Sequence, residues 1–144
     1  MKKAIVSLLF FSLYTLAVTA QSTTDFTVRI DEIKNPGKGT IVLMLFDQKE
    51  GFPKEKDKAR YQASITDFGQ QVSHTFSQIP QGTYAVAAFW DKNDNGKIDT
   101  NFIGMPKEPV AASNLNKMGR PKFQKSSIVI DQAQQDISIR FIND

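Results

Sequence analysis

The residues best placed to do chemistry lie in one short stretch that begins at Asp91. Side-chain oxygens occur at alternate positions, an adjacent glycine allows a sharp bend, and a second carboxylate follows. Such a spacing lets a short loop gather its oxygens around a hard cation such as Ca²⁺. The predicted calcium ligands are the side chains of Asp91, Asn93, Asn95 and Asp99, together with the backbone carbonyl of Lys97.

Two features separate this loop from a helix-flanked EF-hand. Counted from Asp91, position twelve is Phe102 rather than a bidentate glutamate, and two of the first three ligands are neutral amides. Any calcium affinity should therefore be weak, roughly 10⁻⁴ to 10⁻³ M. The alternative is a metal-free turn in which Asn and Asp side chains bond their own backbone and Asn95-Gly96 adopts positive φ. The sequence leaves both interpretations open.

Other catalytic chemistry has less support. The chain has no cysteine and one histidine, His74, which lies in line with core residues of a strand and is expected to be packed. No serine has the Gly-x-Ser-x-Gly context, and no glycine-rich phosphate loop is present. Asp99 and Glu108 could act as a carboxylate pair on an extracellular glycan if their carboxyl groups lie roughly 5 to 9.5 Å apart across a cleft. We expect a protein that is not an enzyme and keep this hydrolase as the alternative.

The first 20 residues predict an export signal. Lys2 and Lys3 precede an apolar run and a small-residue end at Val18-Thr19-Ala20. The apolar run is shorter than the ~20 residues of a spanning helix, so the mature chain, residues 21–144, is expected to have no membrane span and to be periplasmic or extracellular. Removal of the two lysines lowers the formal charge from +3 to +1, which gives no support for nucleic acid as a partner.

The mature chain reads as one all-β domain. Apolar runs or period-two alternation predict seven strands, at residues 24–31, 40–47, 61–66, 71–79, 84–90, 126–131 and 136–142, with no long helix between them. This pattern predicts a β-sandwich. Tyr84 follows a turn and can return its hydroxyl to the backbone, as in a tyrosine corner. The 84–90 strand runs directly into Asp91, so a rigid element should carry the loop.

Two connecting segments complete the chain. Residues 48–60 carry many charges of both signs around Phe52, which predicts a solvated loop or short surface helix anchored by that ring. Residues 100–125 form a long segment broken by glycine and proline. Long loops in compact domains tend to be functional, so we expect this segment to contact a partner. Its small basic cluster lies around Phe123 and comprises Lys117, Arg120, Lys122 and Lys125.

These motifs together resemble the domain-of-unknown-function family 2141 of small secreted bacterial proteins. The likeness rests on Gly82-Thr83-Tyr84-Ala85-Val86, the Asp91–Asp99 loop, Gly104-x-Pro106-x-Glu108, Ser113-Asn114 and Gly51-Phe52-Pro53. The resemblance implies a seven-stranded immunoglobulin-like or prealbumin-like sandwich and no known activity. Trp90 departs from the pattern, since a histidine is expected there in many relatives.

The sequence thus predicts an exported, non-enzymatic binding or structural module. Its 91–99 loop, with or without calcium, would order the 100–125 segment for an unknown protein or glycan at the cell envelope. A purely structural envelope protein would instead pack this segment on the sandwich and leave no concave surface.

Overall fold

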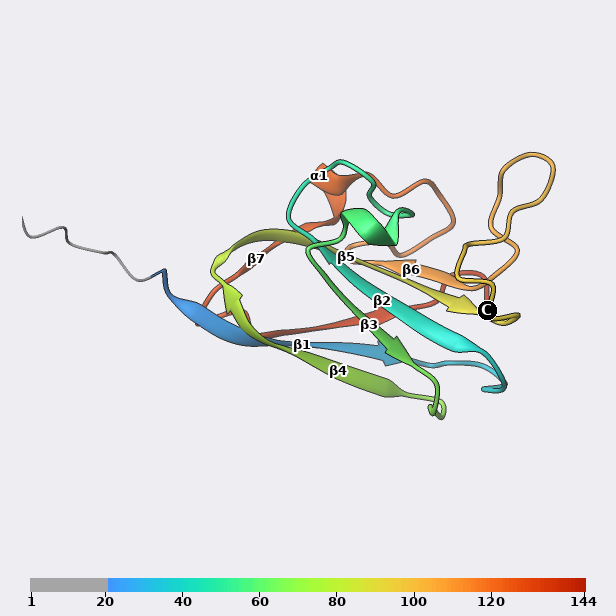
Figure 1. Ribbon diagram of the computed structural model, residues 1–144, viewed down its shortest axis with the longest axis horizontal. Coiled ribbons are helices and arrows are strands. Elements are labelled where there is room, and N and C mark those ends of the chain that lie inside the picture. Colours follow the sequence, from blue (N-terminus) through green and yellow to red (C-terminus); the bar gives the residue numbers. More distant parts are fainter. Residues whose placement is uncertain (1–20) are drawn as a thin grey trace, which may run out of the picture.

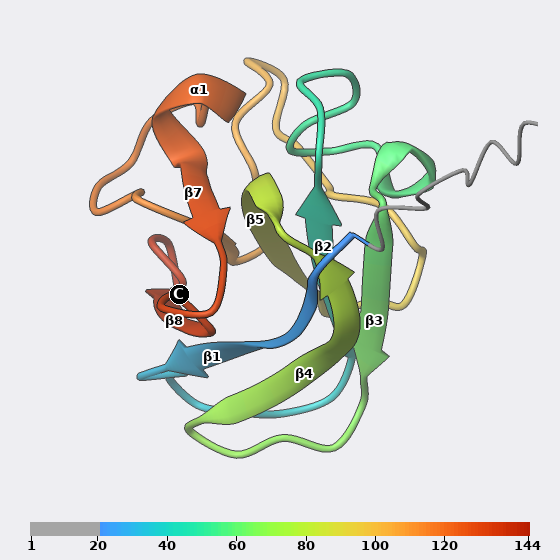
Figure 2. The same cartoon turned by 90° about the vertical axis from the view of Figure 1, so that its left-hand side faces the viewer.

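The computed structural model describes residues 21–144, and the signal peptide predicted at 1–20 lies outside the described residues. Two β-sheets pack face to face, as Figures 1 and 2 show. The smaller sheet has the order β4 (Val72–Pro80), β1 (Thr23–Asp31) and β8 (Asp136–Arg140), with β1 and β8 parallel. The larger sheet has the order β3 (Tyr61–Ile65), β2 (Thr40–Phe46), β5 (Gly82–Asp91) and β6 (Val110–Ala112), and β7 (Ser127–Ile130) also pairs with β5.

The core lies between the sheets and follows the sequence patterns. The alternating residues of β1 bury Phe26, Val28 and Ile30, which are at most 1% exposed. The continuous apolar runs of β2 and β5 are buried on both faces, because the larger sheet packs on the smaller one and also carries loops on its outer side. A second cluster on that outer face contains Val42, Met44, Phe46, Ala87 and Phe89.

Aromatic contacts hold the outer layer in place. The Phe52 ring meets Phe46 edge to face at 5.3 Å between ring centroids, and Phe123 at 6.0 Å. These contacts fix the loop at residues 47–60, which includes a 3₁₀ helix at Lys56–Lys58, and the short helix α1 (Phe123–Ser126). In Figure 1 both lie over the larger sheet, on the side away from the smaller one.

The described residues confirm the all-β prediction but contain eight strands rather than seven. The additional strand, β6, lies inside the segment predicted to be irregular, and α1 forms there as well. β6 has only three residues and no alternation of its own. It forms because Ala111 and Ala112 pair with Ala88 and Ala87 of the established strand β5. Within residues 21–144, no helix is long and apolar enough to span a membrane.

The Tyr84 hydroxyl donates a 2.8 Å hydrogen bond to the Pro80 carbonyl, so the tyrosine corner forms. We expect Tyr84→Phe to lower the free energy of unfolding by about 1 kcal/mol, the net value of one such bond. Urea unfolding at neutral pH measures this loss. Tyr61→Phe is the matched control, because the Tyr61 hydroxyl lies beside the exposed Arg60 guanidinium and accepts from it rather than bonding a backbone carbonyl. An equal loss in both variants would contradict the role of the corner.

Burial raises the pKa of the Tyr84 phenol above its ordinary value of 10.0. The native state then favours the neutral phenol, whose contribution to stability is complete below about pH 10 and declines as the pH rises through the raised pKa. Tyr84→Phe should therefore lose less stability above pH 10 than the parent does.

Candidate functional site

Asp91 ends β5 and closes the loop that follows it. Its side chain is buried at 2% exposed. The backbone N–H of Asn95 donates to Asp91 Oδ1 at 3.1 Å, and that of Gly96 donates to Oδ2 at 2.6 Å. Gly96 has φ of +76°, a left-handed conformation that suits glycine at this bend. Both oxygens of Asp91 thus satisfy backbone donors that the sharp turn leaves free.

Glu108 holds the same loop from the other side. It is 5% exposed, and its Oε1 accepts the Lys92 N–H while its Oε2 accepts the Asp99 N–H, both at 3.0 Å. Its backbone carbonyl accepts a 2.8 Å bond from Asn143 Nδ2. The start and end of the 91–99 loop are therefore tied to one buried carboxylate, which is in turn tied to the C-terminal segment.

The remaining predicted ligands meet at Asp99. Asn93 Nδ2 donates to Asp99 Oδ2 at 2.7 Å, and Asn95 Nδ2 donates to Oδ1 at 3.1 Å. Lys97 contributes its backbone N–H, which donates to Asn95 Oδ1 at 2.9 Å. All five residues predicted from the sequence belong to one connected hydrogen-bond network. Asp91 joins it by accepting the Asn95 and Gly96 N–H groups.

The donor set could hold a hard cation only if its two amides turned their oxygens toward Asp99. The Asn93 and Asn95 carboxamides donate to the Asp99 carboxylate, and their oxygens accept the backbone N–H groups of Asn95 and Lys97. A half-turn of each amide would bring its oxygen toward Asp99 only by breaking these backbone hydrogen bonds. Hard cations prefer such oxygens, and only two of the side chains are anionic. Within residues 21–144 no three His, Cys, Asp or Glu side chains come together as a metal-holding group.

The same contacts show which groups are hydrogen-bonded to Asp99 and Glu108, the two carboxylates of the alternative hydrolase. Glu108 is buried, and both of its carboxylate oxygens accept hydrogen bonds from backbone N–H groups. One of those N–H groups belongs to Asp99 itself. Asp99 accepts from two carboxamides. The pair is linked through the backbone of the loop, and neither residue lines the pocket described below.

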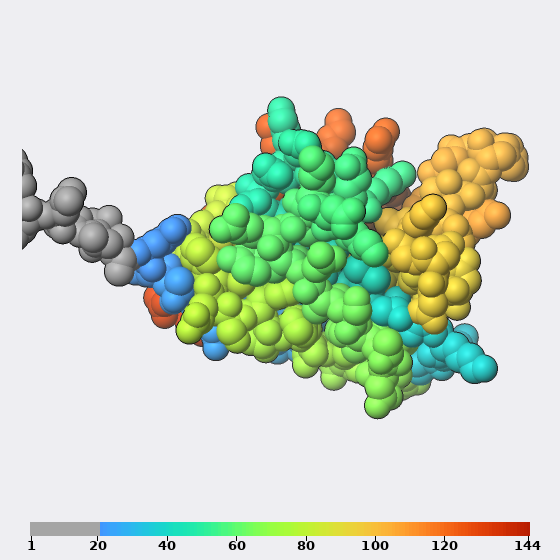
Figure 3. Space-filling model, in the orientation of Figure 1, coloured from blue at the N-terminus to red at the C-terminus, as the bar shows by residue number. Residues whose placement is uncertain are grey.

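Asn101 organises the next turn of the chain. Its Oδ1 accepts the N–H groups of Ile103 at 3.1 Å and Met105 at 2.9 Å, and Thr100 pairs with Pro106 at the base. The tip projects from one end of the molecule, in the gold segment of Figure 3, and Phe102 is 99% exposed there. The loop is thus a hydrogen-bonded projection of β5, with apolar side chains at its end.

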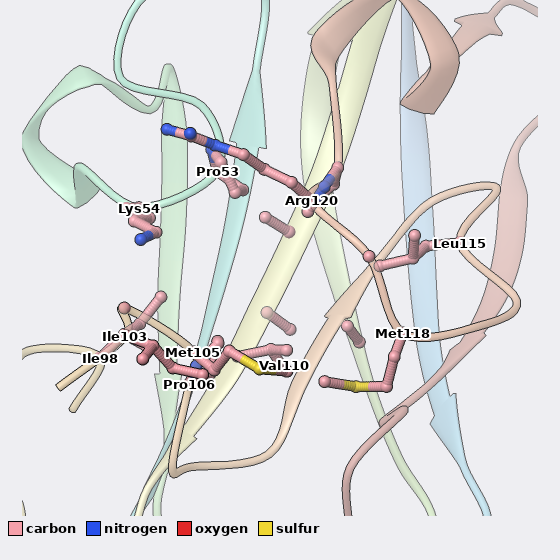
Figure 4. Close-up of a pocket in the computed structure, with 16 residues that line it drawn as sticks. Pro53, Lys54, Ile98, Ile103, Met105, Pro106, Val110, Leu115, Met118 and Arg120 are labelled. Atoms are coloured by element: carbon pink, nitrogen blue, oxygen red, sulfur yellow. The ribbon is translucent and has the colours of Figure 1, made fainter. Parts of the chain in front are cut away.

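A pocket of about 500 Å³ opens between this projection and the outer layer. Its floor is formed by β5 and β6 at Ala87, Ala88 and Ala111. The Ala87 side chain belongs to the outer cluster, and its small size leaves room above the sheet. Its walls come from the 47–60 loop, the 98–106 loop and residues 115–121, with Val110 at the start of β6 beside them. The lining residues labelled in Figure 4 are Pro53, Lys54, Ile98, Ile103, Met105, Pro106, Val110, Leu115, Met118 and Arg120. The 47–60 loop is far in sequence from the two later segments and meets them only in the fold, so no local pattern could have revealed the pocket.

Trp90, the departure from the family pattern, belongs to the interior. It is 2% exposed, packs edge to face on Phe68 at 5.4 Å, and donates from Nε1 to the Lys38 carbonyl at 3.0 Å. Gly39 permits the close approach of this turn, since a methyl group built there would lie 2.3 Å from the Asp91 carbonyl oxygen. The indole therefore helps to position the start of the loop.

Asp91→Asn tests the role of the buried carboxylate. The amide retains one acceptor but places an NH₂ group against a backbone donor, so we expect a loss of about 2 kcal/mol in the free energy of unfolding. Urea unfolding gives the loss, and amide hydrogen exchange should show faster opening of residues 92–99. Asp94→Asn is the control, because Asp94 is exposed and accepts from the Thr40 hydroxyl at 2.7 Å. Equal stability of the two variants would contradict the assignment.

The chain was compared with known proteins. Residues 28–138 match the family described as an uncharacterized protein conserved in bacteria (DUF2141), which covers most of the chain. A search of curated proteins found no match, and neither did a search of solved structures. The matched range includes β5, the 91–108 network and the pocket-lining residues. The chain therefore belongs to the bacterial family DUF2141, as its motifs had indicated.

Proposed function

We propose that this chain is an exported, non-enzymatic binding module that holds an apolar ligand in the pocket on the outer face of its larger sheet. The observation that carries the proposal is the pocket itself, which is concave, mostly apolar and about 500 Å³ in volume. Ligand sites in proteins have these properties and fall in the same range of size, roughly 300 to 1,000 Å³.

The sandwich belongs, in this proposal, to the immunoglobulin-like or prealbumin-like type. Two sheets enclosing one core and the Tyr84 corner support this type. The 91–108 network then acts as a support for the binding site: Asp91 and Glu108 fix the loop whose later residues, Ile98 to Pro106, form one wall of the pocket.

Two observations favour binding over the other functions considered. A purely structural protein would pack residues 100–125 on the sandwich without a concave surface, whereas this segment lines a pocket. A glycan hydrolase would need accessible carboxylates on a cleft, whereas Glu108 is buried and bonded to backbone N–H groups. Met105 and Met118, which line the pocket and are 43% and 44% exposed, add flexible side chains that can adapt to different apolar shapes.

Binding of the neutral dye Nile red to the mature chain tests the proposal. Its fluorescence should rise on binding, and Ile103→Gln and Met118→Gln should each weaken binding about three- to tenfold, because each removes part of the apolar wall. Both side chains are at least 44% exposed, so the variants should fold normally.

Phe102→Gln and Val129→Gln are the matched controls for the dye. Both remove an exposed apolar side chain that does not line the pocket, so the affinity should not change. Absence of dye binding to the parent would overturn the proposed function. Equal weakening by all four variants would show general surface adsorption and would also overturn it.

The second candidate function, weak calcium binding by the 91–99 loop, is supported by the convergence of Asn93, Asn95 and Asp99. Lys97 would add its carbonyl, and Asp91 would contribute charge from beneath. A bound ion would stiffen the projection that forms the pocket wall. With amide donors and two carboxylates, the dissociation constant should lie in the range of roughly 10⁻⁴ to 10⁻³ M.

Thermal melts of the chelator-treated chain test this candidate. Calcium at five times the dissociation constant should stabilise the fold by about 1 kcal/mol, whereas Asp99→Asn should abolish the shift. Asp94→Asn, which leaves the converging side chains intact, should retain it. If calorimetry detects no heat at millimolar calcium and the parent melts at the same temperature with and without it, the ion has no role.

A further inference from the structure

We propose that the ligand of the pocket is an anionic amphiphile: a single alkyl or acyl chain that ends in a carboxylate or phosphate. This inference rests on the proposed function and adds the chemical class of the ligand. Its basis is that apolar side chains line one end of the pocket and two cationic side chains line the other.

One end of the pocket is apolar. In Figure 4, Met105, Val110 and Met118 lie together at the end away from Arg120, with Ile98, Ile103 and Pro106 beside them. None of these side chains has a hydrogen-bonding group suited to a sugar hydroxyl. An unbranched hydrocarbon chain suits such a surface, because burial of each CH₂ group is favourable and needs no polar partner.

The other end carries two cations. Lys54 and Arg120 are the only charged or hydrogen-bonding side chains that line the pocket within the described residues. Both lie toward the same end in Figure 4, near Pro53. They come from different segments, the 47–60 loop and residues 115–121, so folding alone brings them to one end of the pocket.

No carboxylate in the described part of the chain neutralises these cations. Neither Lys54 nor Arg120 forms an ion pair within 4.0 Å among residues 21–144, although five other pairs do form there. No Asp or Glu lines the pocket. Two positive charges beside an apolar cavity therefore favour a ligand whose own charge is negative and lies at one end.

The two cations suit a compact anionic head group. The planar guanidinium of Arg120 can donate two parallel hydrogen bonds to a carboxylate or phosphate, and Lys54 adds a mobile point charge. A glycan would leave the apolar end without suitable contacts, and a neutral lipid would leave both cations unpaired. The formal charge of residues 21–144 is only +1, so the attraction is local to this opening.

Displacement of Nile red by three compounds that share an octyl chain tests the inference: nonanoate, octyl phosphate and 1-octanol. The two anions should displace the dye at concentrations about five- to tenfold lower than the alcohol, because only they pair with the cations. The preference should shrink as sodium chloride rises from 50 to 500 mM. The two anions differ in head group alone, so their order identifies carboxylate or phosphate as the better fit.

The double variant Lys54→Gln/Arg120→Gln should bind the two anions about five- to tenfold more weakly and leave 1-octanol unchanged. Lys49→Gln/Lys107→Gln is the matched control, since it removes the same charge from exposed lysines outside the pocket and should keep the preference. Equal displacement by all three compounds, or an unchanged double variant, would overturn the anionic class while leaving the apolar site intact. Failure of the parent to bind Nile red would instead overturn the proposed function on which the inference rests.

Discussion

Two buried carboxylates that accept backbone N–H groups are the constraint on which the rest of the site depends. A carboxylate removed from water is costly unless its oxygens are fully bonded. Asp91 and Glu108 meet this condition by binding the donors that the turns after β5 leave unpaired. Groups that would destabilise the fold if unpaired therefore define this loop, and the backbone at residues 92, 95, 96 and 99 is held by them.

The sandwich explains why this loop faces a pocket. β5 lies inside the larger sheet, with neighbours on both edges, so its end is a rigid point of departure. The outer face of the sheet is covered by loops rather than by a third sheet, and the small side chain of Ala87 leaves space beneath them. The aromatic contacts of Phe52 close one part of this face and leave the pocket beside it open.

The elements predicted well are those whose signal is local. The alternation of Phe26, Val28 and Ile30 is the signal of the strand predicted at 24–31, and the apolar run at 84–90 is the signal of β5, whose Ala87 and Phe89 lie in the outer cluster. β6 was missed because its three residues are ordered by pairing with β5 and by Ser113, whose Oγ accepts the Val86 N–H at 3.0 Å. No short stretch of sequence contains both β6 and its pairing partner β5.

The sequence by itself determined the all-β architecture, the strand that leads into Asp91 and the five residues of the loop network, because periodicity and the spacing of side-chain oxygens act over a few residues. Only the tertiary structure decided that Glu108 supports the loop and that Lys54 and Arg120 share the opening of an apolar pocket. Those relations join segments separated by 16 residues in the first case, Lys92 to Glu108, and by far more in the second. They exist only after the sheets have packed and have brought the outer loops together.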